Sequence, residues 1–194
     1  MLEESLCKWF AKKIGFNDLS GGIAASGGTL SNLNALIAAR NNAGLASNPN
    51  SVLLVSEDAH SSFVKCIRVM GLDSTNLVRI KTDNKGCMDM QNLRQTISKC
   101  FIDNKKIFAI VATVGTTVRG AIDPIKDISE ICKERNIWLH IDGSIGGIFA
   151  VTSIPIDGLN NINQANSITI NPQKIIGITK TCLLYTSPSP RDRG

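Results

Sequence analysis

The sequence predicts an α/β fold in which a mostly parallel β-sheet is flanked by helices. Short apolar runs typical of strands alternate along the chain with longer segments whose apolar residues recur at helical spacing. No tight hairpin signal joins consecutive strand candidates, which indicates βαβ connections. The 194 residues are 43% hydrophobic and 19% charged, a composition that excludes a disordered tail, a collagen and a coiled coil.

The expected elements follow one another in a regular order. The predicted helices have apolar residues three and four positions apart, and they are 31–40, 61–71, 90–101 and 124–136. The predicted strands are short and rich in β-branched residues, and they are 51–56, 76–80, 107–113, 137–142 and 167–171. Gly71 is expected to end a helix, Asp89 to cap one, and Asp123 to precede the proline that opens the last.

Charge and composition exclude several classes of function. The net charge of +5 is dispersed and forms no basic block, which disfavours nucleic-acid binding. No apolar run is long enough to cross a membrane, and the acidic N-terminus does not resemble a secretory signal, so we expect a cytoplasmic protein. The six cysteines lack zinc-site spacing and are expected to be reduced core residues.

The end of the chain differs from the rest in composition. Residues 183–194, LLYTSPSPRDRG, look like translated adaptor or vector sequence, and we exclude them from the predicted fold. A natural flexible tail is the alternative. On this interpretation residues 1–182 form a partial domain, because the chain stops before its natural domain does.

Polar or glycine-rich segments follow the ends of several predicted strands. They are the turn Ser26–Thr29, His60, the segment Thr113–Thr117, Asp142 and Lys174. Ligands of open α/β sheets bind outside the carboxyl ends of the strands, and so these segments are expected to meet at one edge of the sheet.

The turn Ser-Gly-Gly-Thr precedes a helix and can bind an anion. Its free backbone N–H groups and the helix dipole favour negative charge, and the Thr29 hydroxyl adds a donor. An ordinary helix cap is the alternative. The turn is neither a dinucleotide fingerprint nor a Walker A motif, which disfavours a nucleotide.

Asp142 ends an apolar strand, where a carboxylate is costly to bury without a partner. It can cap the following turn, or it can hold a protonated ring nitrogen or a metal. We expect His140 to face the other side of the strand, which makes the metal the weaker interpretation.

Lys174 follows the last predicted strand and is expected to be partly buried, which favours the neutral amine that attacks a carbonyl carbon. A surface lysine is the alternative. The ring of His60 can stack on a flat ligand or cap a helix, and Thr113 and Thr117 can be simple turn hydroxyls. Pyridoxal phosphate requires an anion site, a carboxylate at its ring nitrogen, a lysine and a flat group over its ring.

With these motifs the sequence resembles the group II pyridoxal-phosphate-dependent amino-acid decarboxylases, of the aromatic-amino-acid and glutamate decarboxylase kind. The matching segments are SGGTLSNLNALIAAR, SEDAHSSFVKCIRVMGL, IVATVGTTVRGAIDPIKDISEICKERNIWLHIDGSIGG and SITINPQKIIGITKTC. The resemblance implies a truncated large domain of the fold-type I pyridoxal-phosphate-dependent transferases. It also implies a homodimer with active sites at the subunit interface.

The resemblance assigns a role to each matching residue. Gly28, Thr29 and Asn171 fall where the family binds the cofactor phosphate. His60 matches the histidine stacked on the ring, and Ser144 matches a small residue beside it. Thr117 matches the residue near the ring hydroxyl, Asp142 the partner of the ring nitrogen, and Lys174 the Schiff-base lysine.

Two positions depart from the family pattern. The chain has Gly143 and Ser144 where relatives often have two alanines, and Gln173 where they usually have histidine before the lysine. Glutamine donates a hydrogen bond but does not titrate near neutral pH, which leaves substrate choice and reaction outcome open.

The implied activity is a carboxy-lyase that converts an L-amino acid to the amine and CO2. The alternatives are another fold-type I enzyme, an aminotransferase or a relative of sphingosine-phosphate lyase, and a non-catalytic remnant that acts as a partner subunit. A nucleotide-binding Rossmann domain is a distant further alternative. By the same resemblance the catalytic loop and the small domain are absent from this chain, which alone is not expected to carry a complete active site.

Overall fold

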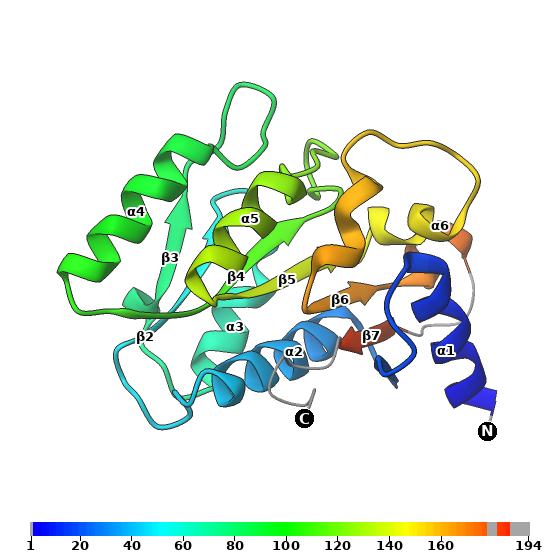
Figure 1. Cartoon of the computed structure of the whole chain (residues 1–194), viewed down its shortest axis with the longest axis horizontal. Coiled ribbons are helices and arrows are strands. Elements are labelled where there is room, and N and C mark those ends of the chain that lie inside the picture. Colours follow the sequence, from blue (N-terminus) through cyan, green and yellow to red (C-terminus); the bar gives the residue numbers. More distant parts are fainter. Residues whose placement is uncertain (1, 178–181, 187–194) are drawn as a thin grey trace.

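The computed structural model describes residues 2–177 and 182–186, which form one seven-stranded sheet with helices on both faces (Figure 1). The strands are β1 (Gly21–Ala25), β2 (Ser51–Ser56), β3 (Leu77–Ile80), β4 (Lys106–Thr113), β5 (Trp138–Gly143), β6 (Ser167–Ile170) and β7 (Cys182–Thr186). The helices are α1 (Leu2–Ile14), α2 (Gly28–Asn42), α3 (Ser62–Val69), α4 (Met90–Ile102), α5 (Ile125–Arg135) and α6 (Pro172–Ile176). Three short 3-10 helices are η1 (Ser74–Asn76), η2 (Gly146–Val151) and η3 (Leu159–Gln164).

The sheet is mostly parallel, as the sequence predicts. The strand order is β1-β7-β6-β5-β4-β2-β3, and all neighbours from β6 to β3 are parallel. Only β7, among the described strands, is antiparallel to its neighbours β1 and β6. The parallel strands end at one common edge, where polar residues of different segments come together.

The structure differs from the sequence analysis at residues 183–186. They form most of β7, which pairs with both β1 and β6, and Tyr185 is fully buried. Excluding this stretch from the fold was therefore wrong, because it fills the gap between two other strands. Residues 187–194 lie outside the described residues, and the adaptor origin of the segment stays a prediction.

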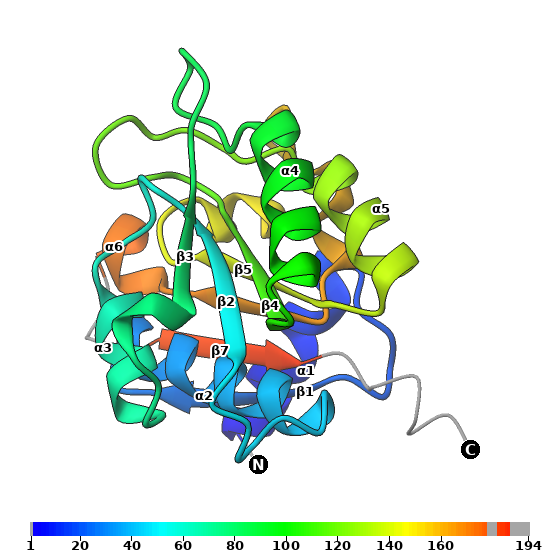
Figure 2. The same ribbon diagram turned by 90° about the vertical axis from the view of Figure 1, so that its left-hand side faces the viewer.

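Helices cover the two faces of the sheet unequally (Figures 1 and 2). Side chains of α1, α4 and α5 pack with one face in the larger apolar cluster. Side chains of α2 and α3 pack with the other face in a second cluster. The strands β2 and β5 are buried along their whole length, which explains the continuous apolar run at 52–55 in β2.

Local signals in the sequence account for several element ends. The carboxylate of Asp89 accepts a hydrogen bond from the Asn92 N–H at 2.6 Å, which confirms it as the cap of α4. Gly71 has a φ of +70°, which favours glycine where the chain leaves α3. Asp123 does not cap α5, where Pro124 is the cap residue, but accepts hydrogen bonds from the N–H groups of Thr113 and Met88, both at 2.7 Å.

The cysteines are free, and all except the half-buried Cys87 are buried, which agrees with the expectation of reduced core residues. Within the described residues, no helix is both long and apolar enough to cross a membrane.

Candidate active site

Most of the predicted site residues surround one cleft at the carboxyl edge of the sheet. The cleft has a volume of about 170 Å³ and opens to solvent. The predicted residues that line it are Gly28, Thr29, His60, Thr117, Asp142, Ser144 and Lys174. These residues come from five separate segments of the chain, and the parallel topology explains why they meet.

The start of α2 forms one wall of the cleft. Gly28 and Thr29 are its first two residues, so their N–H groups precede the first hydrogen-bonded turn, and no acidic residue lies in that turn. A Cβ atom at Gly28 would lie 2.8 Å from the Ser144 hydroxyl oxygen, so glycine permits a close approach of the two segments. This helix end is suited to an anion.

Asp142 presents a buried carboxylate to the cleft. Its side chain is 5% exposed, and it lies beside Thr113 in the pairing of β5 with β4. One oxygen, Oδ2, accepts a hydrogen bond from Asn32 Nδ2 at 3.0 Å, and the other, Oδ1, accepts one from the Ser144 N–H at 3.1 Å. No lysine or arginine of the described residues pairs with this carboxylate. A cationic N–H group of a ligand would supply the missing partner.

His140 lies on the same side of β5 as Asp142, so the expectation that it faces the other side was wrong. Side chains two residues apart share one face of a strand, because successive side chains alternate. Its Nε2 lies 3.1 Å from Asn32 Oδ1, and its Nδ1 lies 2.8 Å from Ser167 Oγ. Burial lowers the pKa of His140 to about 4, partly opposed by Asp142 and by a hydrogen bond to the Ser167 backbone. The imidazole is therefore neutral at pH 7.

His60 and Thr117 lie on the exposed rim of the cleft, on the loops after β2 and β4. The Nδ1 atom of His60 accepts a hydrogen bond from the Ser62 N–H at 3.1 Å at the start of α3. The imidazole thus has the helix-capping contact that the sequence allows, and it also borders the cleft. Both features fix the ring at the entrance.

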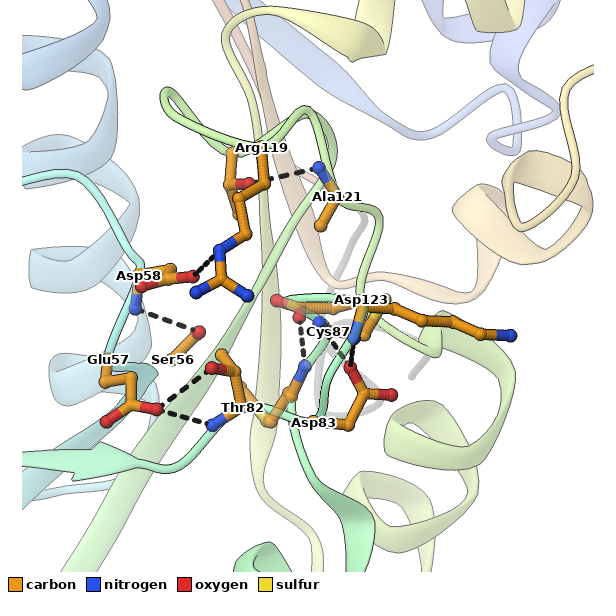
Figure 3. A network of polar contacts seen from close by, with 12 residues as sticks. Ser56, Glu57, Asp58, Thr82, Asp83, Cys87, Arg119, Ala121 and Asp123 are labelled. Atoms are coloured by element: carbon orange, nitrogen blue, oxygen red, sulfur yellow. Dashed lines mark hydrogen bonds and ion pairs between the residues drawn. The ribbon is translucent and has the colours of Figure 1, made fainter.

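A network of polar contacts joins the loops that carry His60 and Thr117 (Figure 3). The Asp58 carboxylate lies 3.5 Å from Arg119 Nε, which links the two loops across the edge of the sheet. The Glu57 carboxylate accepts hydrogen bonds from the N–H and hydroxyl of Thr82, at 2.7 and 2.9 Å. These two bonds lower the pKa of Glu57. The network fixes the rim without entering the cleft.

Lys174 borders the cleft but is exposed, so the expectation of a partly buried lysine was wrong. It lies on the short helix α6, whose buried residue is Pro172, and its side chain therefore extends on the open side. Asn171 precedes this helix and does not border the cleft, although its side chain is buried and its Oδ1 has no hydrogen-bond partner.

Sequence reasoning did not select Asn32 and treated Thr113 as a simple turn hydroxyl. Both line the cleft, and the Thr113 hydroxyl is buried without a hydrogen-bond partner. The sequence does contain an indication for Asn32. It is a polar residue on the same helix face as the core residues Leu36 and Ala39, which marks it as a buried polar group. Ser62, Gly115 and Ile145 complete the lining.

Comparison with known proteins identifies the family. Residues 1–186 match the family described as "Pyridoxal-dependent decarboxylase conserved domain". Acidic amino acid decarboxylase GADL1 of Xenopus tropicalis is 33% identical over 97% of this chain and 39% of its own length. Aromatic-L-amino-acid decarboxylase of Bacillus atrophaeus is 31% identical over 89% of this chain and 36% of its own length.

A solved structure agrees with these sequence matches. The crystal structure of mouse CSAD superposes with a TM-score of 0.90 at 27% identity, covering 96% of this chain and 41% of the mouse chain. The fold is that of a pyridoxal-phosphate enzyme of fold type I. The chain belongs to the pyridoxal-dependent decarboxylase family, and it spans about two fifths of the length of these relatives.

Proposed function

We propose that this chain is the cofactor-binding part of a pyridoxal-phosphate-dependent carboxy-lyase that converts an L-amino acid to the amine and CO2. The observation that carries the proposal is the cleft, which brings a helix N-terminus, a buried carboxylate and a lysine amine together. The family match supports both the cofactor and the reaction.

The chemistry of the cleft fits pyridoxal phosphate. The Asp142 carboxylate is 5% exposed and has N–H donors but no cation among the described residues, which suits a protonated ring nitrogen. The N-terminus of α2, with Gly28 and Thr29, suits the phosphate, and Asn171 is proposed to contact it as well. The amine of Lys174 is exposed on the cleft, where it can reach a carbonyl carbon.

The remaining site residues act on the ring and the substrate in this proposal. His60 would stack on the ring, Ser144 would lie beside it, and Thr117 would contact its hydroxyl. When bound, pyridoxal phosphate supplies the electron sink that accepts the electron pair left by CO2. Asp142 would keep the ring nitrogen protonated, because its negative charge favours the cationic form of that nitrogen, and the protonated ring is the better electron acceptor.

Lys174 has two tasks in the same proposal. Its amine would hold the cofactor through the carbonyl carbon while no substrate is bound, and it would be the group that holds this carbon again after the product amine has left. Gln173 precedes it and can donate a hydrogen bond, but it cannot transfer a proton at neutral pH. Proton transfer to the product carbon is therefore assigned to another group.

The likeness to amino-acid decarboxylases suggests the substrate class. The relatives' names include acidic and aromatic amino-acid decarboxylases, and so an L-amino acid is proposed without choosing between these side chains. We further propose that the full-length protein is a cytoplasmic homodimer with its active site at the subunit interface, as the family resemblance implies.

The test is an assay of the full coding sequence against a panel of L-amino acids, with amine and CO2 measured together. Asp142→Ala is expected to lower turnover about a hundredfold or more, because charge develops at the ring during the reaction. The exposed Asp157→Ala serves as a matched control and is expected to leave turnover unchanged. Near-normal turnover in Asp142→Ala would contradict the assignment.

The products separate the alternatives. A keto acid would indicate an aminotransferase, and an aldehyde would indicate a lyase of another kind. A full-length protein that binds no pyridoxal phosphate would indicate the non-catalytic remnant.

A further inference from the structure

A path of hydrogen bonds between buried polar side chains leads to the Asp142 carboxylate. It runs from Trp138 Nε1 to Ser167 Oγ at 2.8 Å, and from Ser167 Oγ to His140 Nδ1 at 2.8 Å. It continues from His140 Nε2 to Asn32 Oδ1 at 3.1 Å, and from Asn32 Nδ2 to Asp142 Oδ2 at 3.0 Å. This hydrogen-bond path joins α2, β5 and β6, and it ends at the cleft.

The direction of the hydrogen bonds follows from the carboxylate end. An ionised carboxylate only accepts, so the amide nitrogen of Asn32 faces Asp142 and its oxygen faces His140. His140 Nε2 must then carry a proton and donate. In a neutral imidazole the other nitrogen, Nδ1, accepts, so the Ser167 hydroxyl donates to it.

The indole end agrees with this direction. Trp138 Nε1–H is only a donor, and it donates to the Ser167 oxygen, whose own proton is used toward His140. Every link therefore points from Trp138 toward Asp142. Hydrogen bonds aligned in one direction polarise one another, which strengthens the last bond to the carboxylate.

Packing alone does not explain why the polar side chains of this hydrogen-bond path are buried. Asn32 is 1% exposed, and His140 and Ser167 are fully buried. Apolar side chains of similar volume fill such positions without the cost of desolvating polar groups. The polar atoms instead form a connected path to a carboxylate that has no cation among the described residues. Within the described part of the chain, the second carboxylate oxygen, Oδ1, has only the Ser144 N–H as a hydrogen-bond partner.

We propose that Asn32 and His140 are positioning residues that fix the Asp142 carboxylate in the orientation required to bind a protonated ring nitrogen. The inference rests on the proposed function, because it concerns the same carboxylate. His140 acts through Asn32 and does not itself touch the cofactor. The neutral state of the imidazole keeps a second positive charge away from Asp142, so the ligand is its cationic partner.

The first test determines which ring nitrogen of His140 is protonated, and it needs no cofactor. The full 194-residue chain contains only two histidines, so the Nδ1 and Nε2 signals of His140 can be assigned by ¹⁵N NMR with a His60→Gln comparison. The inference predicts that Nε2 is protonated and Nδ1 is not, with no titration between pH 8 and about 5 because burial lowers the pKa to about 4. Protonation of Nδ1 at pH 7 would require the Asn32 oxygen to face Asp142, which overturns the inference.

The second test measures binding of pyridoxal phosphate to the same chain by visible absorption. Asn32→Leu removes the donor to Asp142 and is expected to weaken binding about tenfold or more, since a hydrogen bond to a charged group contributes that much. Asn34→Leu makes the same change on the same helix, at a half-buried position outside the cleft, and is expected to leave binding unchanged.

A conservative variant separates positioning from packing. His140→Gln can donate to Asn32 and accept from Ser167, whereas His140→Leu of similar volume can do neither. We expect the glutamine variant to retain binding within about threefold and the leucine variant to lose as much as Asn32→Leu. Equal binding in both His140 variants would overturn the positioning role, with thermal melts confirming that each is folded.

The two tests distinguish the inference from the proposed function. Absence of pyridoxal phosphate binding to the unmodified chain would count against the proposed function. The NMR result tests the hydrogen-bond path in either case. A correct path with unchanged binding in Asn32→Leu would overturn the inference while leaving the proposed function in place.

Discussion

The buried carboxyl group of Asp123 is expected to make the free energy of unfolding decrease as the pH rises. Its carboxylate is fully buried between the ends of β4 and the segment before α4, where it accepts the N–H groups of Thr113 and Met88. Burial raises its pKa to about 6, opposed by these two hydrogen bonds and reinforced by Asp58 and Asp83. Because Thr113 lies beside Asp142, this buried group also shapes the cleft.

The sign of the effect follows from the raised pKa. The folded protein binds the proton more tightly than the unfolded chain, whose carboxyl has a pKa of about 3.9. The stabilisation is therefore fully present below about pH 4 and is lost as the pH rises through about 6. A shift of about two units corresponds to roughly 3 kcal/mol between these limits.

The assay is urea denaturation of the full chain from pH 4.5 to pH 7.5, followed by circular dichroism. The Asp123→Asn variant has no proton to lose at this position. The free energy of unfolding of the parent should therefore fall by about 2 kcal/mol relative to this variant between pH 4.5 and pH 7.5. Asp157→Asn, at an exposed position, removes the same charge and should show no such trend. A parent-minus-variant difference that stays constant or rises with pH would refute the reasoning.

Other predictions concern close contacts and buried charge. Gly143→Ala places a Cβ 2.9 Å from the Thr169 carbonyl oxygen, and it should lower the free energy of unfolding by about 1–3 kcal/mol in urea titrations. Gly28→Ala places a Cβ 2.8 Å from the Ser144 hydroxyl, and it should weaken pyridoxal phosphate binding about tenfold in absorption titrations while the melting temperature stays unchanged. Arg40→Met leaves three backbone carbonyl oxygens without their guanidinium donor and should destabilise the chain by about 2–4 kcal/mol, seen as a lower urea midpoint.

The fold could be predicted where local pattern and tertiary burial agree. The continuous apolar run at 51–56 coincides with β2, because a central parallel strand is buried on both faces. Strand β7 was missed because Leu183 and its neighbours stand next to a Ser-Pro stretch that has no strand character. Only pairing with β6 and with β1, which lies near the other end of the chain, shows that this segment belongs to the sheet.

The candidate site was predicted from residue types, but its supporting contacts were not. The spacing of segments at strand ends was sufficient to bring Asp142 and Lys174 to one cleft. The partner of Asp142 comes from Asn32, which is 110 residues away, and no local pattern specifies such a contact. The exposure of Lys174 likewise depends on how α6 leaves the sheet rather than on the residues around it.

We propose that one ring binds between the carboxylate of Asp142 and the amine of Lys174. To test this, the protein is incubated with pyridoxal phosphate, the complex is reduced with borohydride, and the label is located by peptide mass spectrometry. We expect the label on the peptide that contains Lys174, and a lower yield of it in Asp142→Ala. Labels spread evenly over the surface lysines, unaffected by that substitution, would contradict it.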